Sequence, residues 1–204
     1  MKFLLLFSRV VDTVNGAIGK LMMWFILAAT LISAGNAISR YAFSVSSNAF
    51  LEIQWYLFGA VFLLGGGYAF LRNAHVRIDV VASRLSARAR NWIDVIGILA
   101  FLLPLCYMIA KMGWPVFERA WVSGEVSSNA GGLVRWPAYL LIPVGFVLLG
   151  LQGVSELIKR LHFLFGGGPD PLDHTGPSET EMLAKDIAEA EKAAKAASKG
   201  GQAS

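Results

Sequence analysis

The sequence predicts an all-α integral membrane protein with four transmembrane helices. Its 204 residues are 55% apolar and only 16% charged, whereas about a quarter of the residues of a soluble domain are charged. The apolar residues are concentrated in four blocks that contain no Asp, Glu, Lys or Arg. Three of these blocks reach the length of about 20 residues that an α-helix needs to cross some 30 Å of hydrocarbon.

The four charge-free blocks set the predicted spans and the domain organisation. The blocks are residues 21–39, 53–71, 95–110 and 136–155. The third block is short, so its helix needs flanking residues whose charged ends reach the membrane surface. The predicted spans are therefore about 17–39, 52–71, 91–112 and 136–160. They lie in a membrane domain of residues 1–165, and residues 166–204 are expected to be a cytoplasmic linker and a polar, mobile tail.

Two further amphipathic helices are predicted outside the spans. Residues 2–15 carry Phe3, Phe7, Val10 and Val14 at helical spacing, which predicts an interfacial helix on the membrane surface. Pro115 can begin a short outer helix with an apolar face. Ser86 can serve as the N-cap of the third membrane helix.

Basic residues predict the orientation of the spans. Ten near-membrane Lys and Arg residues fall on the side of the termini, and four fall on the other side. The first group is Lys2, Arg9, Lys20, Arg72, Arg77, Arg84, Arg88, Arg90, Lys159 and Arg160; the second is Arg40, Lys111, Arg119 and Arg135. The positive-inside rule then places both termini in the cytoplasm. Membrane lipids explain this charge better than nucleic acid does, because the basic loop has no aromatic residues for base stacking.

Residues that could carry chemistry are sparse. Cys106 is the sole cysteine, and no His, Cys, Asp and Glu residues show metal-ligand spacing. No predicted span has an ionisable residue at its centre, where coupled carriers usually place one. We expect no catalytic residue, no substrate-binding or metal-binding residue and no cofactor. Asn36, Gln54 and Gln152 fit helix–helix hydrogen bonds better than a ligand-binding role.

Small residues recur on the predicted spans. Gly59, Gly66 and Gly67 flatten the second span, and other small residues do so on the first and fourth. In lipid, such residues let helices approach closely. They indicate either packing against another membrane protein or packing within the chain itself.

An ordered series of segments resembles a known family. LEIQWYLFG, GGGYAFLRNAHVRIDVV, LSARARNWIDVIG and GEVSSNAGGLVRWPAYLLIPVGFVLLGLQGVSELIK are similar to the DctQ-like small membrane subunit of tripartite ATP-independent periplasmic (TRAP) transporters. The resemblance covers roughly residues 20–160. It implies an accessory subunit in the bacterial inner membrane, which braces a large permease subunit and helps a periplasmic binding protein to dock. It also implies sodium-coupled uptake of a small solute, with an organic acid as the expected class and sodium bound by the large subunit.

The resemblance and the sequence together nominate contact residues rather than catalytic ones. The candidates for the interface with the large subunit are Gly59, Gly66, Gly67, Glu52, Trp55, Arg72, His75, Arg77 and Asp79. The candidates for periplasmic docking are Glu118, Arg119, Glu125 and Asn129. Asp79 contributes little to orientation, so we expect it either to pair with Arg72 or Arg77, or to cap a helix, or to remain a solvated surface charge.

Two other classes of protein remain open from the sequence. An autonomous four-helix carrier or channel would transport a solute without other subunits. A membrane enzyme would need a convergent polar pocket, for which residues 72–79 are the one candidate. Neither class has the residues that it requires.

Overall fold

The computed structural model describes residues 2–45, 47–73, 85–166 and 168–172, and the chain divides into two units, Met1–Gly168 and Pro169–Ser204. The described part of the first unit is helical. The elements among its described residues are α1 (Lys2–Phe43), α2 (Asn48–Leu71), α4 (Ala87–Gly97), the π-helical turn η1 (Ile98–Leu102), α5 (Leu103–Ser123) and α6 (Trp136–Leu164). In the described part of the second unit, the Leu172 N–H donates to the Asp170 carboxylate at 3.0 Å.

Among the described residues, four helices are long and apolar enough to cross a membrane, which confirms the predicted fold class. They are α1, α2, the continuous run Ala87–Ser123 and α6. Each observed helix includes its predicted span and extends beyond it at one end or both. Ser86 caps α4 as predicted, because its hydroxyl accepts a hydrogen bond from the Ala89 N–H at 3.3 Å.

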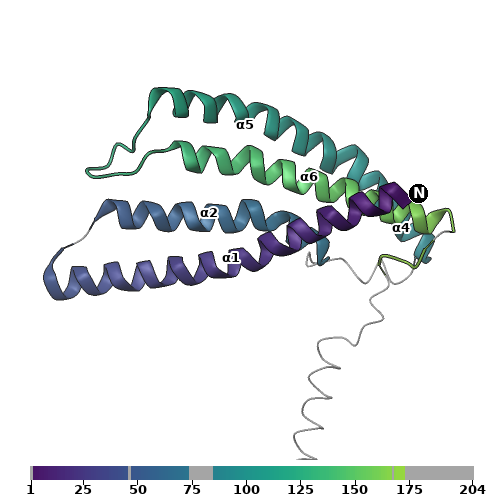
Figure 1. The fold of residues 1–204 in the computed structure, drawn as a ribbon, viewed down its shortest axis with the longest axis horizontal. Coiled ribbons are helices and arrows are strands. Elements are labelled where there is room, and N and C mark those ends of the chain that lie inside the picture. Colours follow the sequence, from purple (N-terminus) through teal and green to yellow (C-terminus); the bar gives the residue numbers. More distant parts are fainter. Residues whose placement is uncertain (1, 46, 74–84, 167, 173–204) are drawn as a thin grey trace, which may run out of the picture. The chain divides into compact units, whose positions relative to one another are not determined.

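The helices of the first unit form an open layer in the order α5, α6, α2, α1 (Figure 1). Neighbours in this order pack closely, and α1 also reaches α6. Between the described residues of α5 and those of α1 or α2, no packing of comparable extent occurs. An open layer differs from a closed four-helix bundle because both of its broad faces remain accessible.

The layer has two ends that differ in their connections. We call the end where α1 begins and α2 and α6 finish the terminal end (Figure 1). We call the opposite end, where α1 leads into α2 and α5 leads into α6, the hairpin end. The two polar sites described below lie at these ends.

The predicted interfacial segment 2–15 is helical but is not a separate helix, because α1 runs without a break from Lys2 to Phe43. Several of its apolar residues point outward, with Phe3 79% and Val10 55% exposed. Its buried face carries the polar Ser8 and Asn15 together with the apolar Val11. This arrangement suits a lipid environment, where apolar side chains can face the acyl chains and polar side chains need partners within the protein.

The predicted outer helix at Pro115 is likewise continuous with the third span, since Pro115 lies inside α5. A proline within a helix removes one backbone hydrogen bond and bends the helix without having to end it. The π turn Ile98–Leu102 interrupts the same run, and it ends two residues before Pro104, which also lacks an N–H. The third membrane helix therefore contains two irregular points, whereas the sequence predicted a separate outer helix at Pro115 and did not predict the π turn.

Candidate functional site

A group of polar side chains, which we call the terminal network, joins three helices at the terminal end. Its members come from α1, α4 and α6, and most of them are nearly inaccessible. The members are Ser8, Asp12, Asn15, Asp94, Gln152, Ser155, Glu156, Lys159 and Arg160.

Two basic residues of α6 connect the carboxylates of the terminal network. Lys159 lies 2.8 Å from Asp12 of α1 and 2.6 Å from Glu156. Arg160 donates to Glu156 at 2.6 Å and to Asp94 of α4 at 3.1 Å. Arg160 has no accessible surface and Glu156 has 2%. Burying such charges is costly unless each has a partner, and here they satisfy one another.

Amide and hydroxyl groups extend the terminal network along the α1–α6 contact. Asn15 donates to Gln152 at 2.9 Å, and the Gln152 amide donates to Asp12 at 2.9 Å. Ser155 and Ser8 hydroxyl oxygens lie 2.7 Å apart. Gln152 therefore forms the helix–helix bonds predicted for it. The network fixes the N-terminal part of α1 and the last turn of α4 against α6.

The other two buried amides named from the sequence behave differently. Gln54 donates to the Phe50 carbonyl of its own helix at 2.8 Å, so this bond lies within a helix and not between helices. The Oδ1 atom of Asn36 is buried without a partner among the described residues. Only Gln152 among the three ties helices together in the described structure.

Glu52 organises the hairpin end. Its carboxylate accepts hydrogen bonds from the Ser127 hydroxyl, from the Asn129 amide at 2.8 Å and from the Leu133 N–H at 2.7 Å. Only 7% of Glu52 is exposed. The sequence assigned Glu52 and Asn129 to two different contacts, and the structure brings them together. The role of Glu52 is to shape the connection between α5 and α6, which we call the 124–135 loop.

Two neighbours of Glu52 on one face of α2 hold the same loop. Asn48 lies one turn before Glu52 and donates to the Ala130 carbonyl at 3.0 Å. Tyr56 lies one turn after it and donates to the Val134 carbonyl at 3.1 Å. Positions four apart share a helix face, which explains why these three side chains act together.

The 124–135 loop also has bonds of its own. An isolated bridge pairs Val126 with Val134, and Arg135 donates to Glu125 at 3.0 Å. Glu125 is therefore a surface residue in an ion pair, as are many exposed charges. These bonds give the loop a defined conformation, which places Asn129 and Glu125 at the hairpin end.

The three candidate glycines of α2 occupy different environments. A side chain at Gly67 would collide with Asn15, so this glycine serves the contact with α1. A Cβ at Gly59 would reach ordinary contact distance from Leu141 of α6. A Cβ at Gly66 would meet nothing within 4 Å. Gly66 therefore has the open surroundings that a contact with another protein needs.

The remaining candidates for partner contacts are either exposed or lie outside the described residues. Trp55 is 75% exposed near the start of α2, and Arg72 is exposed at its end with its guanidinium over the Tyr68 ring. Glu118 and Arg119 are exposed on α5. His75, Arg77 and Asp79 lie outside the described residues, so their expected contacts stay predictions.

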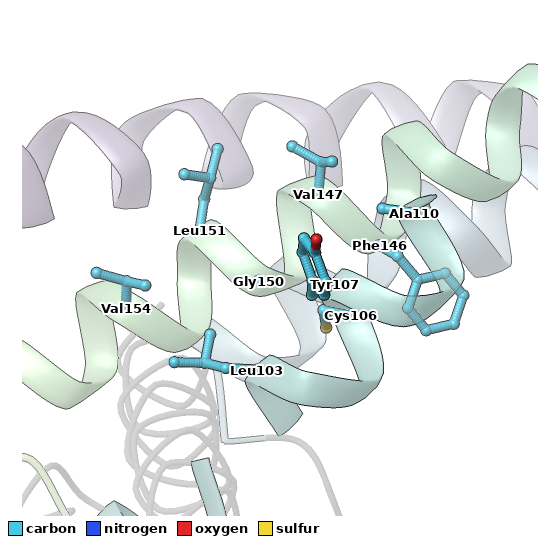
Figure 2. Close-up of a pocket in the computed structure, with 9 residues that line it drawn as sticks. All are labelled: Leu103, Cys106, Tyr107, Ala110, Phe146, Val147, Gly150, Leu151 and Val154. Carbon is cyan, nitrogen blue, oxygen red and sulfur yellow. The ribbon is translucent and has the colours of Figure 1, made fainter. Parts of the chain in front are cut away.

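A groove of about 260 Å³ between α5 and α6 is almost wholly apolar. Figure 2 shows Leu103, Val147 and Leu151 among its lining side chains, with the buried Cys106 beneath Gly150. A carboxylate solute would find no basic side chain there. Within the described ranges, no three His, Cys, Asp or Glu residues are grouped to hold a metal ion.

The fold and these sites define a class of protein: a small multi-pass membrane protein whose polar groups tie its own helices and loop together. The family model for the DctQ component of tripartite ATP-independent periplasmic transporters matches residues 29–163. The chain therefore belongs to the DctQ family, and it is a small permease subunit of a bacterial TRAP transporter. Such subunits are transport components and not enzymes.

Two relatives match most of the chain. A protein of Haemophilus influenzae, named as a TRAP transporter small permease protein, is 24% identical over 76% of this chain and 93% of its own length. The C4-dicarboxylate TRAP transporter small permease protein DctQ of Vibrio cholerae is 26% identical over 90% of this chain and 87% of its own length. No solved structure gives a significant match.

Proposed function

We propose that this subunit braces the static scaffold of a large permease subunit in the bacterial inner membrane. The observation that carries the proposal is the open helical layer, in which only 11–33% of the most apolar stretch of each span is buried within the chain. Membrane helices associate through close packing and hydrogen bonds. A layer with two uncovered faces supports attachment along one face, and Gly66 lies where a partner helix could approach.

The hairpin end is the proposed docking surface for a periplasmic binding protein. Glu52 holds the 124–135 loop in one conformation, and Glu118 and Arg119 are exposed on the last turns of the neighbouring α5. Charged groups on a pre-formed surface guide the encounter between proteins and set their orientation. Orientation by the positive-inside rule supports this assignment, because it places the hairpin end in the periplasm and both termini in the cytoplasm.

Substrate and sodium are proposed to bind to the large subunit. In the described part of this chain the membrane helices offer no group of metal-ligating residues, and the α5–α6 groove is apolar. We therefore propose no cofactor for this subunit. An organic acid is the proposed class of solute, and one of the two relatives bears a name that specifies C4-dicarboxylates.

The test is co-purification with the large permease subunit after co-expression. Gly66→Leu should reduce the yield of the complex. Position 66 is open within this chain, and a leucine there would push away a helix of the large subunit that packs against it. Gly35→Leu on α1 is the matched control, since its surroundings are equally open. Equal yields for both variants and the parent would contradict a contact at Gly66. Solute uptake by liposomes that contain this chain alone would overturn the accessory role and favour an autonomous carrier.

A further inference from the structure

A second groove, of about 500 Å³, lies between α1 and α2 at the terminal end. Its lining includes Lys20 and Gly16 from α1 and Tyr68 and Arg72 from α2. We call it the α1–α2 groove. It is separate from the apolar groove between α5 and α6 and from the loop at the hairpin end.

The α1–α2 groove presents two positive charges that have no carboxylate partner among the described residues. Lys20 is exposed and makes no ion pair there. Arg72 donates through Nε to the Tyr68 hydroxyl at 3.2 Å and stacks over the same ring. The carboxylate of Asp12 also lines the groove, but Lys159 neutralises it at 2.8 Å.

Two glycines of α1 create the space. The Tyr68 ring lies so close to Gly19 that a Cβ there would come within 2.3 Å of it. A Cβ at Gly16 would meet nothing within 4 Å, so the groove is open at that point. The tyrosine therefore seats against one glycine, and the other leaves room for a ligand next to the basic side chains.

The groove also lies at a defined depth. Lys20 directly precedes the first charge-free block and Arg72 directly follows the second. Both charges thus mark the boundary between hydrocarbon and headgroups. Trp24 lies one turn deeper on α1 and is 67% exposed, as expected for a side chain beside acyl chains.

We propose that the α1–α2 groove binds the headgroup of an anionic phospholipid. The Lys20 ammonium and the Arg72 guanidinium contact the phosphate, and Tyr68 orients the guanidinium. The acyl chains run along the exposed apolar surface of α1 and α2. An acidic segment of another protein is favoured less, because the charges occur at the depth where phosphates are concentrated and the groove continues into apolar surface. The site needs no partner subunit and does not depend on the proposed bracing role.

The test uses the delipidated full-length chain in detergent and counts bound lipids by native mass spectrometry. The probes are phosphatidylglycerol, phosphatidylcholine and inorganic phosphate. We expect phosphatidylglycerol to bind preferentially, and the double variant Lys20→Ala/Arg72→Ala to weaken it about 25-fold, since each basic group contributes a factor of about five. The double variant Arg40→Ala/Arg119→Ala removes two exposed charges at the hairpin end and should bind like the parent.

A second pair of variants separates shape from charge. Gly16→Leu fills the groove and keeps both basic residues, so it should also lose the preference for phosphatidylglycerol. Gly35→Leu makes the same change at an open position elsewhere on α1 and should not. The proposal is overturned if phosphatidylcholine binds as tightly, if both double variants weaken binding equally, or if Gly16→Leu binds normally. Competition by millimolar inorganic phosphate would identify a soluble-anion site instead, and burial of Arg72 against a carboxylate of another subunit in the assembled transporter would identify a protein interface.

Discussion

Arg160 of α6 donates to Asp94 of α4 at 3.1 Å, and the same guanidinium donates to Glu156 one turn earlier on α6 at 2.6 Å. This arginine has no accessible surface. A single side chain therefore links two carboxylates and holds two helices together at the terminal end.

Replacing Arg160 by alanine should destabilise the protein strongly. The change leaves Glu156 and Asp94 without their shared partner, and breaking a buried ion pair costs about 3–5 kcal/mol. Unfolding in detergent, followed by circular dichroism, measures the loss. Arg119→Ala is the control, because Arg119 is exposed on α5. Similar stability for both variants would show that the terminal network contributes little.

Glu52→Ala should loosen the 124–135 loop while the membrane helices remain folded. The carboxylate accepts bonds from Ser127, Asn129 and Leu133, and an alanine side chain can accept none of them. Faster amide hydrogen exchange at Leu133 is the expected signature. Glu118→Ala on the exposed surface of α5 should leave that exchange unchanged. Full protection of Leu133 in Glu52→Ala would refute the role given to Glu52.

Gly145→Ala and Gly66→Ala should change the stability of the isolated subunit in opposite directions. A Cβ at Gly145 would come 2.7 Å from the Leu63 carbonyl oxygen, so α2 and α6 must separate, at a cost of about 1–3 kcal/mol. A Cβ at Gly66 meets nothing, and alanine favours a helix by up to about 1 kcal/mol. Thermal unfolding in detergent measures both values. A neutral Gly145→Ala would contradict the close approach of these helices.

The proposed orientation predicts which residues react with a membrane-impermeant thiol reagent. Cys106, the native cysteine, is buried and is first replaced by alanine. Ser128→Cys should then be labelled from outside the inner membrane, because Ser128 is exposed in the 124–135 loop. Arg84→Cys should be labelled only after the membrane is opened. The reverse pattern would invert the topology.

The sequence by itself determined the class of protein, an all-helical one with four long apolar helices. The lengths of charge-free blocks such as residues 53–71 and 136–155 can be read directly from the sequence. These lengths match what an apolar helix needs to cross a membrane. The cap at Ser86 was also predictable, since capping depends on a few neighbouring residues. The order of the segments carried the family resemblance, which the family model confirms.

The tertiary structure decided which face of each helix is inside. In a soluble protein the apolar face marks the core, but lipid accepts apolar side chains as readily as a protein interior does. Val10 and Val14 therefore face outward while Asn15 is buried. For the same reason the sequence analysis used Lys159 and Arg160 only to predict the orientation of the spans. In the structure both side chains form ion pairs with carboxylates of other helices.

Pairings between distant residues were equally inaccessible to sequence reasoning. Glu52 and Leu133 are joined only because α2 and the 124–135 loop meet at the hairpin end. A pattern of helical period places Asn48, Glu52 and Tyr56 on one face, but it does not say what that face contacts. The open order α5, α6, α2, α1 supplies that information, because packing in lipid depends on the fit of particular surfaces and not on apolar content.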